Sequence, residues 1–291
     1  MSANNGLRAT PLSAFPVTGP IGVFDSGYGG LTILEQIRSH LPQLDYIYLG
    51  DNARSPYGTR SFEVVYEFTL EAVKTLFDMG CPLVILACNT ASAKALRTIQ
   101  QTYLPTAHPT RRVLGVIRPT VEQACLVTRS GHIGLLATPG TVLSASYPLE
   151  VGKLYPQLTV TSQACPLWVP LVENGEADSD GADYFVEKYI RLLLERDPLI
   201  DTLILGCTHY PLLLGKIMRY VPSGITVISQ GGLVASSLCD YLARHRSMAA
   251  RITQGGTCRF YTTESAEKFS ASASLFLHTK VEAQTLRNKS L

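Results

Sequence analysis

Two segments of the chain share one pattern, in which a short apolar run is followed by a cysteine and then by small polar residues. The first segment covers residues 83–92 and holds Cys88, and the second covers residues 202–211 and holds Cys207. A short run of branched apolar residues predicts a strand buried on both faces, as in a parallel sheet. The small polar residues predict the start of a helix. Each cysteine should therefore lie where a strand leads into a helix, at the sheet edge where open α/β proteins bind ligands.

This setting suits reactive thiols, because a helix start favours negative charge and so stabilises a thiolate. One such cysteine in each half of the chain predicts two thiols that face one substrate. The other cysteines lack this setting and are expected to be small core residues: Cys81, Cys125, Cys165, Cys239 and Cys258. Of these, Cys165→Ser is expected to leave activity unchanged. Because no two cysteines form a C-x-x-C motif, we expect no metal site.

A second pair of segments indicates that the chain contains two similar halves. Residues 21–29 and residues 133–141 both open with Ile-Gly and an apolar pair, and both continue into a turn that contains glycine. In each half this segment comes first and the strand with its cysteine comes later. We therefore expect two similar Rossmann-like α/β domains with largely parallel sheets, related by a pseudo-twofold axis, with the active site in the cleft between them.

The glycine-rich turn at residues 25–30 begins with an acid, Asp25. A glycine-rich turn between a strand and a helix commonly binds phosphate, but a carboxylate would repel phosphate. Asp25 suits an ammonium group or a role in proton transfer better. The alternative is that Asp25 only caps the helix that follows.

The length of 291 residues favours two domains. We expect residues 1–20 to be a disordered lead, residues 21–116 plus 226–291 to form the first domain, and residues 117–225 to form the second. Within these domains the sequence predicts a helix over residues 61–79, a loop at 105–112 and a strand at 113–117. The polar residues 279–291 are expected to fray.

Charge and hydropathy exclude several classes of partner. The formal net charge of +2 is too small to indicate a nucleic-acid or anionic-membrane partner. No stretch of the sequence is apolar for long enough to span a membrane, and residues 1–20 do not form a secretory signal. The odd number of cysteines, without paired spacing, favours a reducing compartment. We therefore expect a cytoplasmic location.

Six short motifs occur in one order along the chain. They are Asp25-Ser26-Gly27, Pro56-Tyr57-Gly58, Cys88-Asn89-Thr90, Ala137-Thr138-Pro139-Gly140-Thr141, Val169-Pro170-Leu171-Val172-Glu173 and Gly206-Cys207-Thr208-His209-Tyr210-Pro211. Each motif alone is weak, but together they resemble the glutamate racemases of the cofactor-independent aspartate/glutamate racemase superfamily. The resemblance runs from about residue 21 to the glycine pair at 231–232.

The resemblance implies an isomerase that interconverts L-glutamate and D-glutamate without a cofactor and supplies D-glutamate for peptidoglycan. Carried over by position, the resemblance implies that Cys88 and Cys207 are the two acid/base thiols, assisted by Asp25, Glu173 and His209. It implies substrate contacts from Asp25, Ser26, Tyr57, Gly58, Asn89, Thr90, Thr138, Thr141, Thr208 and His209. The sequence leaves open whether the enzyme forms a homodimer.

Two residues depart from the pattern of this family. Arg118 stands where an acidic or small residue is expected, and Gln230 precedes Gly231 where an acid or serine is usual. We expect neither residue to contact a catalytic residue.

Two thiols explain racemisation because one can remove the Cα proton from one face while the other returns a proton to the opposite face. Alternatives remain open: a racemase for aspartate or another amino acid, a non-catalytic two-domain binding protein for a small acid, and a Cys–His hydrolase. Alternative interpretations also remain open for single residues. Glu173 could be a plain surface acid, His209 a structural histidine, and Tyr57 a residue that only packs within its turn.

Overall fold

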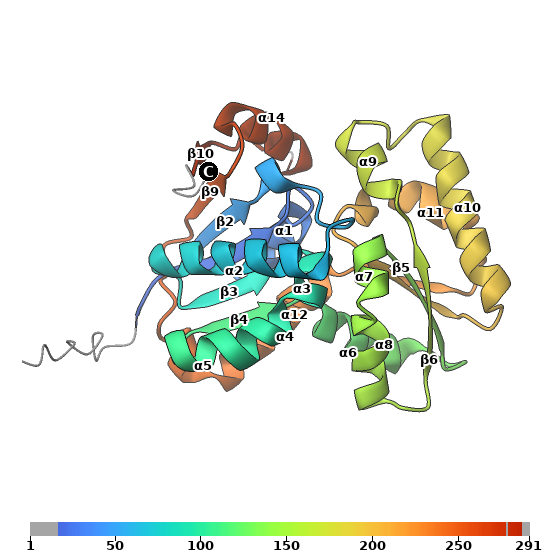
Figure 1. The fold of residues 1–291 in the computed structure, drawn as a ribbon, viewed down its shortest axis with the longest axis horizontal. Helices are drawn as coiled ribbons and strands as arrows, with labels where there is room; N and C mark the ends of the chain where they lie inside the picture. The colour runs from blue at the N-terminus through green and yellow to red at the C-terminus, as the bar shows by residue number, and fades with distance from the viewer. Residues whose placement is uncertain (1–16, 278, 287–291) are drawn as a thin grey trace, which may run out of the picture.

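The chain folds into two α/β lobes that lie side by side, each built on its own parallel sheet (Figure 1). This computed structural model describes residues 17–277 and 279–286. We call the part built on the six-stranded sheet the larger lobe and the part built on the four-stranded sheet the smaller lobe. Every strand pair within the two sheets is parallel. The predicted fold class is thereby confirmed.

The sheet of the larger lobe has the strand order β10-β9-β2-β1-β3-β4. Its strands are β1 (Ile21–Asp25), β2 (Tyr46–Gly50), β3 (Leu83–Leu86), β4 (Arg112–Gly115), β9 (Cys258–Thr262) and β10 (Ala283–Thr285). The central strands β1, β2 and β3 are buried at every position, as their nearly continuous apolar sequences predict.

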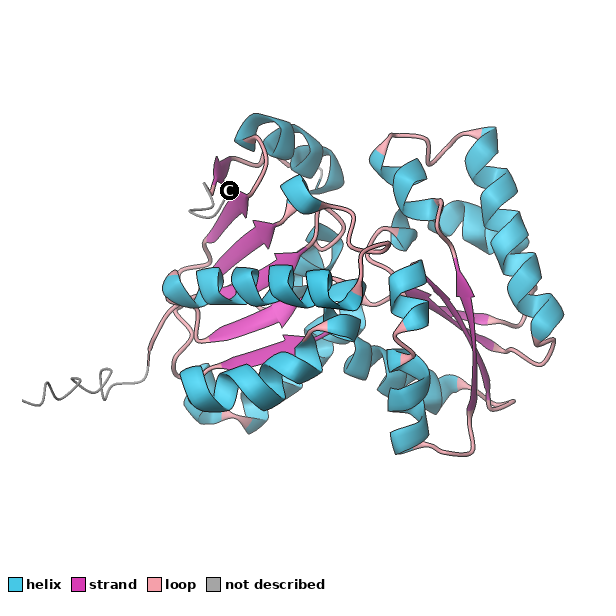
Figure 2. Ribbon diagram, viewed as in Figure 1, coloured by secondary structure: helices cyan, strands magenta, loops and turns pink. Residues whose placement is uncertain are grey.

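Helices cover both faces of this sheet (Figure 2). One face packs against α1 (Leu31–His40), α12 (Gly231–Arg244), α13 (Arg246–Ala249) and α14 (Ala266–Leu277). The other packs against α2 (Phe62–Asp78), α3 (Asn89–Lys94), η2 (Ile99–Tyr103) and α5 (Leu104–Ala107). The short elements η1 (Asn52–Arg54) and α4 (Leu96–Thr98) complete this lobe. The Ser61 hydroxyl caps α2 by accepting the Val64 N–H at 3.3 Å, so the predicted start of this helix is confirmed.

The smaller lobe has the strand order β6-β5-β7-β8. Its strands are β5 (His132–Ala137), β6 (Thr159–Ala164), β7 (Thr202–Gly206) and β8 (Thr226–Ile228). One face packs against α9 (Trp168–Glu173), α10 (Asp180–Arg196), η3 (Tyr210–Leu213) and α11 (Leu214–Tyr220). The other packs against α6 (Ile117–Val127), α7 (Pro139–Leu143) and α8 (Ser146–Leu154).

The two sheets repeat one arrangement, since β2-β1-β3-β4 in the larger lobe matches β6-β5-β7-β8 in the smaller lobe strand for strand. The chain crosses between lobes first between β4 and α6 and again between β8 and α12. An expected boundary at residues 225 and 226 would separate β8 from β7, with which it pairs. The second crossing therefore comes after Ile228.

Some local predictions were wrong. Residues 105–107 of the predicted loop are helical, and Val116 and Ile117 are the N-cap and first residue of α6 rather than the end of a strand. Residues 1–16 of the expected disordered lead lie outside the described residues, but Gly19 pairs with Ile252 in an isolated parallel bridge. Within the expected frayed tail, residues 283–285 form β10, and residues 287–291 lie outside the described part. No helix within the described ranges is both long and apolar enough to cross a bilayer.

Candidate active site

A cavity of about 60 Å³ lies between the lobes, where the carboxyl ends of the central strands of both sheets meet. A single water needs roughly 10–15 Å³ of such space, so the cavity is of small-molecule size. Both Cys88 and Cys207 line it, one from each lobe. The structure also places these predicted residues on its wall: Ser26, Tyr57, Gly58, Asn89, Thr90, Thr138, Glu173, Thr208 and His209.

Cys88 lies at the junction of β3 and α3, as its sequence setting predicts. Its sulfur caps α3 by accepting the Ala91 N–H at 3.4 Å, and the Ser26 hydroxyl lies 3.5 Å from the same sulfur. Burial and the neighbouring Asp25 carboxylate raise the pKa of this thiol to about 12, against the opposing effect of the Ser26 and Ala91 hydrogen bonds. Cys88 therefore rests as a thiol at neutral pH.

Asp25 lies behind the cavity wall rather than on it. Its side chain is fully buried, and one carboxylate oxygen accepts the Gly27 N–H at 2.8 Å. The other oxygen, Oδ1, is buried without a hydrogen-bond partner in the described part of the chain. Burial raises the pKa of Asp25, although His209 lowers it in part. The Asp25 side chain does not cap α1, so the capping alternative was wrong.

Cys207 has a different set of neighbours, which form a chain from its sulfur to the cavity rim. His209 Nδ1 lies 3.8 Å from the Cys207 sulfur, and His209 Nε2 lies 3.1 Å from Glu173 Oε1. Burial lowers the pKa of His209, but Cys207 and Glu173 raise it to about 10 overall. His209 is therefore an imidazolium at neutral pH, with both ring nitrogens donating.

Threonine hydroxyls connect the lobes at the cavity. Thr90 Oγ1 lies 3.0 Å from Thr138 Oγ1 and 3.3 Å from Thr141 Oγ1. Thr138 caps α7 by accepting the Thr141 N–H at 3.3 Å. Of these three threonines, Thr90 and Thr138 line the cavity, whereas Thr141 does not.

The glycine-rich turn of the larger lobe closely approaches the smaller lobe. A Cβ atom at Gly29 would lie 2.2 Å from Thr208 Oγ1 and 2.6 Å from His209 Nδ1. Thr32 Oγ1 also donates to the Thr208 carbonyl at 3.3 Å. Only a residue without a side chain fits at position 29 while the lobes are this close.

The loop at residues 55–60 forms another wall of the cavity. The Tyr57 hydroxyl donates to Asp51 Oδ2, so its ring, rather than its hydroxyl, faces the cavity. The Gly58 carbonyl accepts the Gly140 N–H at 2.7 Å from the smaller lobe. Lys94 reaches the same loop and donates to the Arg60 carbonyl at 2.6 Å. The loop is thus held by both lobes.

Several cavity residues were missed by sequence reasoning: Ser55, Pro56, Thr59, Pro139, Pro166, Val169 and Pro170. Most are apolar or lie within motifs whose polar members drew attention. Cys165 also lines the cavity, so the expectation that it is only a core residue was incomplete. Cys239 and Cys258 are partly exposed rather than buried. Position within a strand–turn–helix motif was the signal that could have found Pro139 and Cys165.

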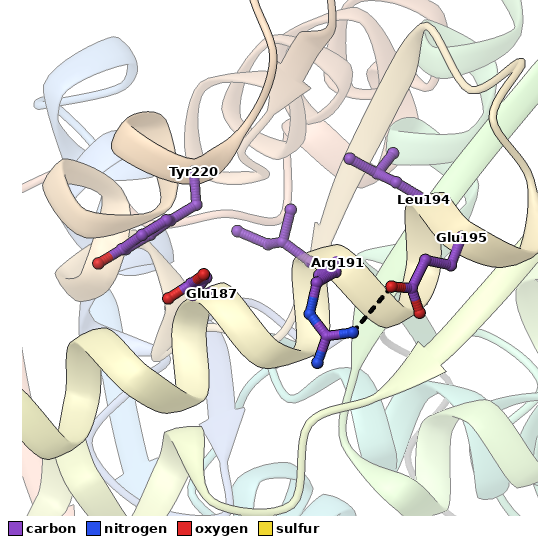
Figure 3. A pocket seen from close by; sticks show the side chains of 6 residues that line it. Glu187, Arg191, Leu194, Glu195 and Tyr220 are labelled. Atoms are coloured by element: carbon purple, nitrogen blue, oxygen red, sulfur yellow. Dashed lines mark hydrogen bonds and ion pairs between the residues drawn. The ribbon is translucent and has the colours of Figure 1, made fainter.

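Other features do not supply chemistry. Among residues 17–277 and 279–286, no three His, Cys, Asp or Glu side chains come close enough to hold a metal ion. A shallower hollow lies on the outer surface of the smaller lobe, between α10 and Tyr220 of α11 (Figure 3). There Arg191 and Glu195 form an ion pair at 2.8 Å, and the residues that line the hollow include none of the predicted site residues.

Comparison with known proteins gives consistent matches. The model of the Asp/Glu/Hydantoin racemase family matches residues 31–237. A glutamate racemase of Paracoccus denitrificans (strain Pd 1222) is 41% identical over 276 residues, which are 91% of this chain and 99% of that protein. The crystal structure of glutamate racemase isoform RacE1 from Bacillus anthracis aligns with a TM-score of 0.84 at 36% identity, covering 92% of this chain and 97% of that one.

The crystal structure of a Francisella tularensis glutamate racemase in complex with D-glutamate is equally similar. It aligns with a TM-score of 0.83 at 32% identity and covers 94% of this chain and 99% of that one. Both the sequence and the fold therefore match the same group of proteins over nearly their full lengths. The chain belongs to the Asp/Glu/hydantoin racemase family, as one of its glutamate racemases.

Proposed function

We propose that this chain interconverts L-glutamate and D-glutamate by a two-thiol reaction that needs no cofactor. The observation that carries the proposal is that Cys88 and Cys207, from different lobes, line one small cavity. In this reaction one sulfur removes the Cα proton from one face of the substrate, and the other sulfur delivers a proton to the opposite face. The roles of the two thiols exchange when the opposite enantiomer is the substrate.

The two cysteines have different surroundings. The raised pKa of Cys88, about 12, keeps this group protonated and able to donate a proton. His209 lies 3.8 Å from the Cys207 sulfur and connects Cys207 to Glu173. A two-base racemase needs one group that removes a proton and another that donates one.

Removing the Cα proton next to a carboxylate needs donors for the charge that develops on it. The hydroxyls of Ser26, Thr90, Thr138 and Thr208 surround the cavity and can hold the substrate carboxylate. A preorganised donor of this kind contributes roughly 3–4 kcal/mol of transition-state stabilisation in other enzymes. Asp25 and Glu173 assist from outside this set, Asp25 beside Cys88 and Glu173 through His209.

The proposal extends to the organisation and setting of the enzyme. We assign residues 21–116 and 230–286 to one domain and residues 117–229 to the other, with hinge motion at the two crossings. We further propose that the enzyme works in the cytoplasm as a homodimer and supplies D-glutamate for peptidoglycan. Light scattering of the purified protein tests the homodimer.

Turnover in deuterated water tests the proposed reaction. With L-glutamate and no added pyridoxal phosphate, circular dichroism should show loss of optical activity, and the D-glutamate formed should carry deuterium at Cα. The assay is repeated with L-aspartate to test substrate strictness. If no acidic amino acid exchanges its Cα proton, the proposed function is wrong.

A further inference from the structure

Three buried polar side chains next to Cys88 in the fold form a closed ring of hydrogen bonds, and a fourth joins the ring at one point. Asn89 Nδ2 donates to Gln230 Oε1 at 2.5 Å, and Gln230 Nε2 donates to the Tyr147 hydroxyl at 2.8 Å. The Tyr147 hydroxyl in turn donates to Asn89 Oδ1 at 2.7 Å, which closes the ring. Gln230 Nε2 also donates to Thr120 Oγ1 at 2.9 Å. None of the four residues is more than 2% exposed.

The ring joins the two lobes at the place where the chain crosses between them. Asn89 is the first residue of α3 in the larger lobe, whereas Tyr147 in α8 and Thr120 in α6 belong to the smaller lobe. Gln230 stands between β8 and α12, on the second crossing. The departure of Gln230 from the family pattern thus coincides with a contact to a cavity residue, Asn89, although none of its side-chain hydrogen bonds goes to a predicted catalytic residue.

Donors and acceptors in the ring are matched. The Thr120 hydroxyl donates to the Val116 carbonyl at 2.7 Å, so its oxygen can accept a hydrogen bond from Gln230. The two hydrogens of the Gln230 amide point toward Thr120 and Tyr147, and Gln230 Nε2 also lies 3.2 Å from Asn89 Oδ1. Asn89 uses one amide hydrogen and its Oδ1 within the ring. Because a buried network of paired groups is rigid, Gln230 sets the orientation of the Asn89 side chain.

We propose that Gln230 is a positioning residue that holds Cys88 in place relative to the smaller lobe, and therefore relative to Cys207. The proposal rests on the two-thiol reaction proposed above. Asn89 is bonded directly to Cys88, and the Cys88 sulfur caps the same helix start that the ring holds. Cys207 has separate support from His209 and Glu173. Loss of the ring should therefore disturb one thiol and spare the other.

Gln230→Leu tests the proposal, because it keeps the volume and removes every hydrogen bond that Gln230 makes. We expect kcat/KM to fall roughly 10- to 100-fold, as misplacement of a reacting group does in other enzymes. Enantiomers have equal free energies, so kcat/KM must fall equally in both directions. Rates alone thus cannot show which thiol has moved, but isotope effects can.

The Cα-deuterium isotope effect on kcat/KM distinguishes the two thiols. In the direction where Cys88 removes the proton, that step becomes more rate-limiting in Gln230→Leu, and the isotope effect should rise. In the opposite direction the return of a proton from Cys88 becomes limiting, so the effect should fall. An equal change in both directions, or none, overturns the proposal.

Two further variants separate positioning from general loss of stability. Tyr147→Phe removes one hydroxyl from the ring and should shift the isotope effects in the same directions, with a non-additive result in the double variant. Thr69→Val removes a buried hydroxyl that donates to the Val65 carbonyl at 2.7 Å within α2, away from the cavity. It should lower stability without changing either isotope effect.

Alkylation with iodoacetamide gives a readout that does not depend on turnover. The intact, folded enzyme is alkylated and then analysed by peptide mass spectrometry. In Gln230→Leu the rate of alkylation at Cys88, relative to that at Cys207, should change several-fold. An unchanged ratio overturns the positioning role even if the wild-type chain proves inactive. A changed ratio in an inactive wild-type chain supports the positioning role and refutes only the proposed function.

Discussion

The hydroxyl oxygens of Thr90 and Thr138 lie 3.0 Å apart, although the two residues follow central strands of different sheets. This contact brings the strand ends of the two lobes together at one point beside Cys88. On another side of the cavity, Gly29 lies close to Thr208. Together these two contacts between the lobes close the cavity. The structure is therefore that of a closed cleft, in which electrostatic interactions are strengthened by the exclusion of water.

Replacing either Cys88 or Cys207, the two thiols proposed to transfer protons, should abolish racemisation. Cys88→Ser and Cys207→Ser should each lower kcat by at least about 100-fold, because a serine hydroxyl is a far weaker acid than a thiol and does not ionise to an alkoxide that could remove the Cα proton. Circular dichroism of glutamate turnover measures the loss. Cys125→Ser is the matched control, since Cys125 is a buried cysteine of the smaller lobe outside the cavity. Cys165 is unsuitable as a control because it lines the cavity.

The pKa of His209 predicts how stability depends on pH. The folded protein holds the His209 proton up to about pH 10, whereas the unfolded chain releases it near 6.5. The stabilising contribution is therefore complete below pH 6.5 and is lost as pH rises toward 10. Urea unfolding of wild type and His209→Asn across this range should show the advantage of wild type shrinking.

Asp25 should lower stability at neutral pH while supporting activity. Because burial raises its pKa above the usual 3.8, the folded state resists ionisation of this carboxyl, and stability falls as pH rises past 3.8. Asp25→Asn removes this ionisation and should unfold at higher urea concentration than wild type at pH 7. Its kcat should nevertheless fall at least about tenfold, because the charge beside Cys88 is lost. A variant that is both less stable and fully active would contradict this account.

A side chain at position 29 should prevent full closure of the cleft. In Gly29→Ala the new Cβ would lie 2.2 Å from Thr208 Oγ1, a distance that forces the lobes apart. We expect kcat/KM to fall roughly 10- to 100-fold, since the two thiols would no longer be held at the distance that the substrate needs. Steady-state kinetics measures this change. Gly152→Ala is the control, because nothing lies within 4 Å of a Cβ at that helical position.

The sequence predicted the strands and the positions of Cys88 and Cys207 well because their signals are local. The apolar runs before Cys88 and Cys207 required buried strands, and the small polar residues after them required helix starts. The repeated Ile-Gly segments at 21–22 and 133–134 indicated two similar halves. These features depend on residues close together in the chain, so propensity and periodicity were sufficient to identify them.

Contacts between segments far apart in the chain could not be predicted from local propensity and periodicity. The ring of Asn89, Gln230 and Tyr147 joins residues from three separate parts of the chain, and nothing in the sequence near any one of them indicates the other two. The buried position of Asp25 behind the cavity is likewise not evident from its turn motif. Strand β10 is short and polar, so pairing with β9 rather than its own sequence decides its structure.

The equivalent strand orders of the two sheets place a cysteine after the corresponding strand in each lobe. The neighbours of the two sulfurs differ, with Ser26 beside one and His209 beside the other. Because the two sides of the cavity come from different stretches of the chain, a substitution can change the surroundings of one sulfur and leave those of the other as they are. A reaction with two equivalent directions can therefore be carried out by two unlike halves.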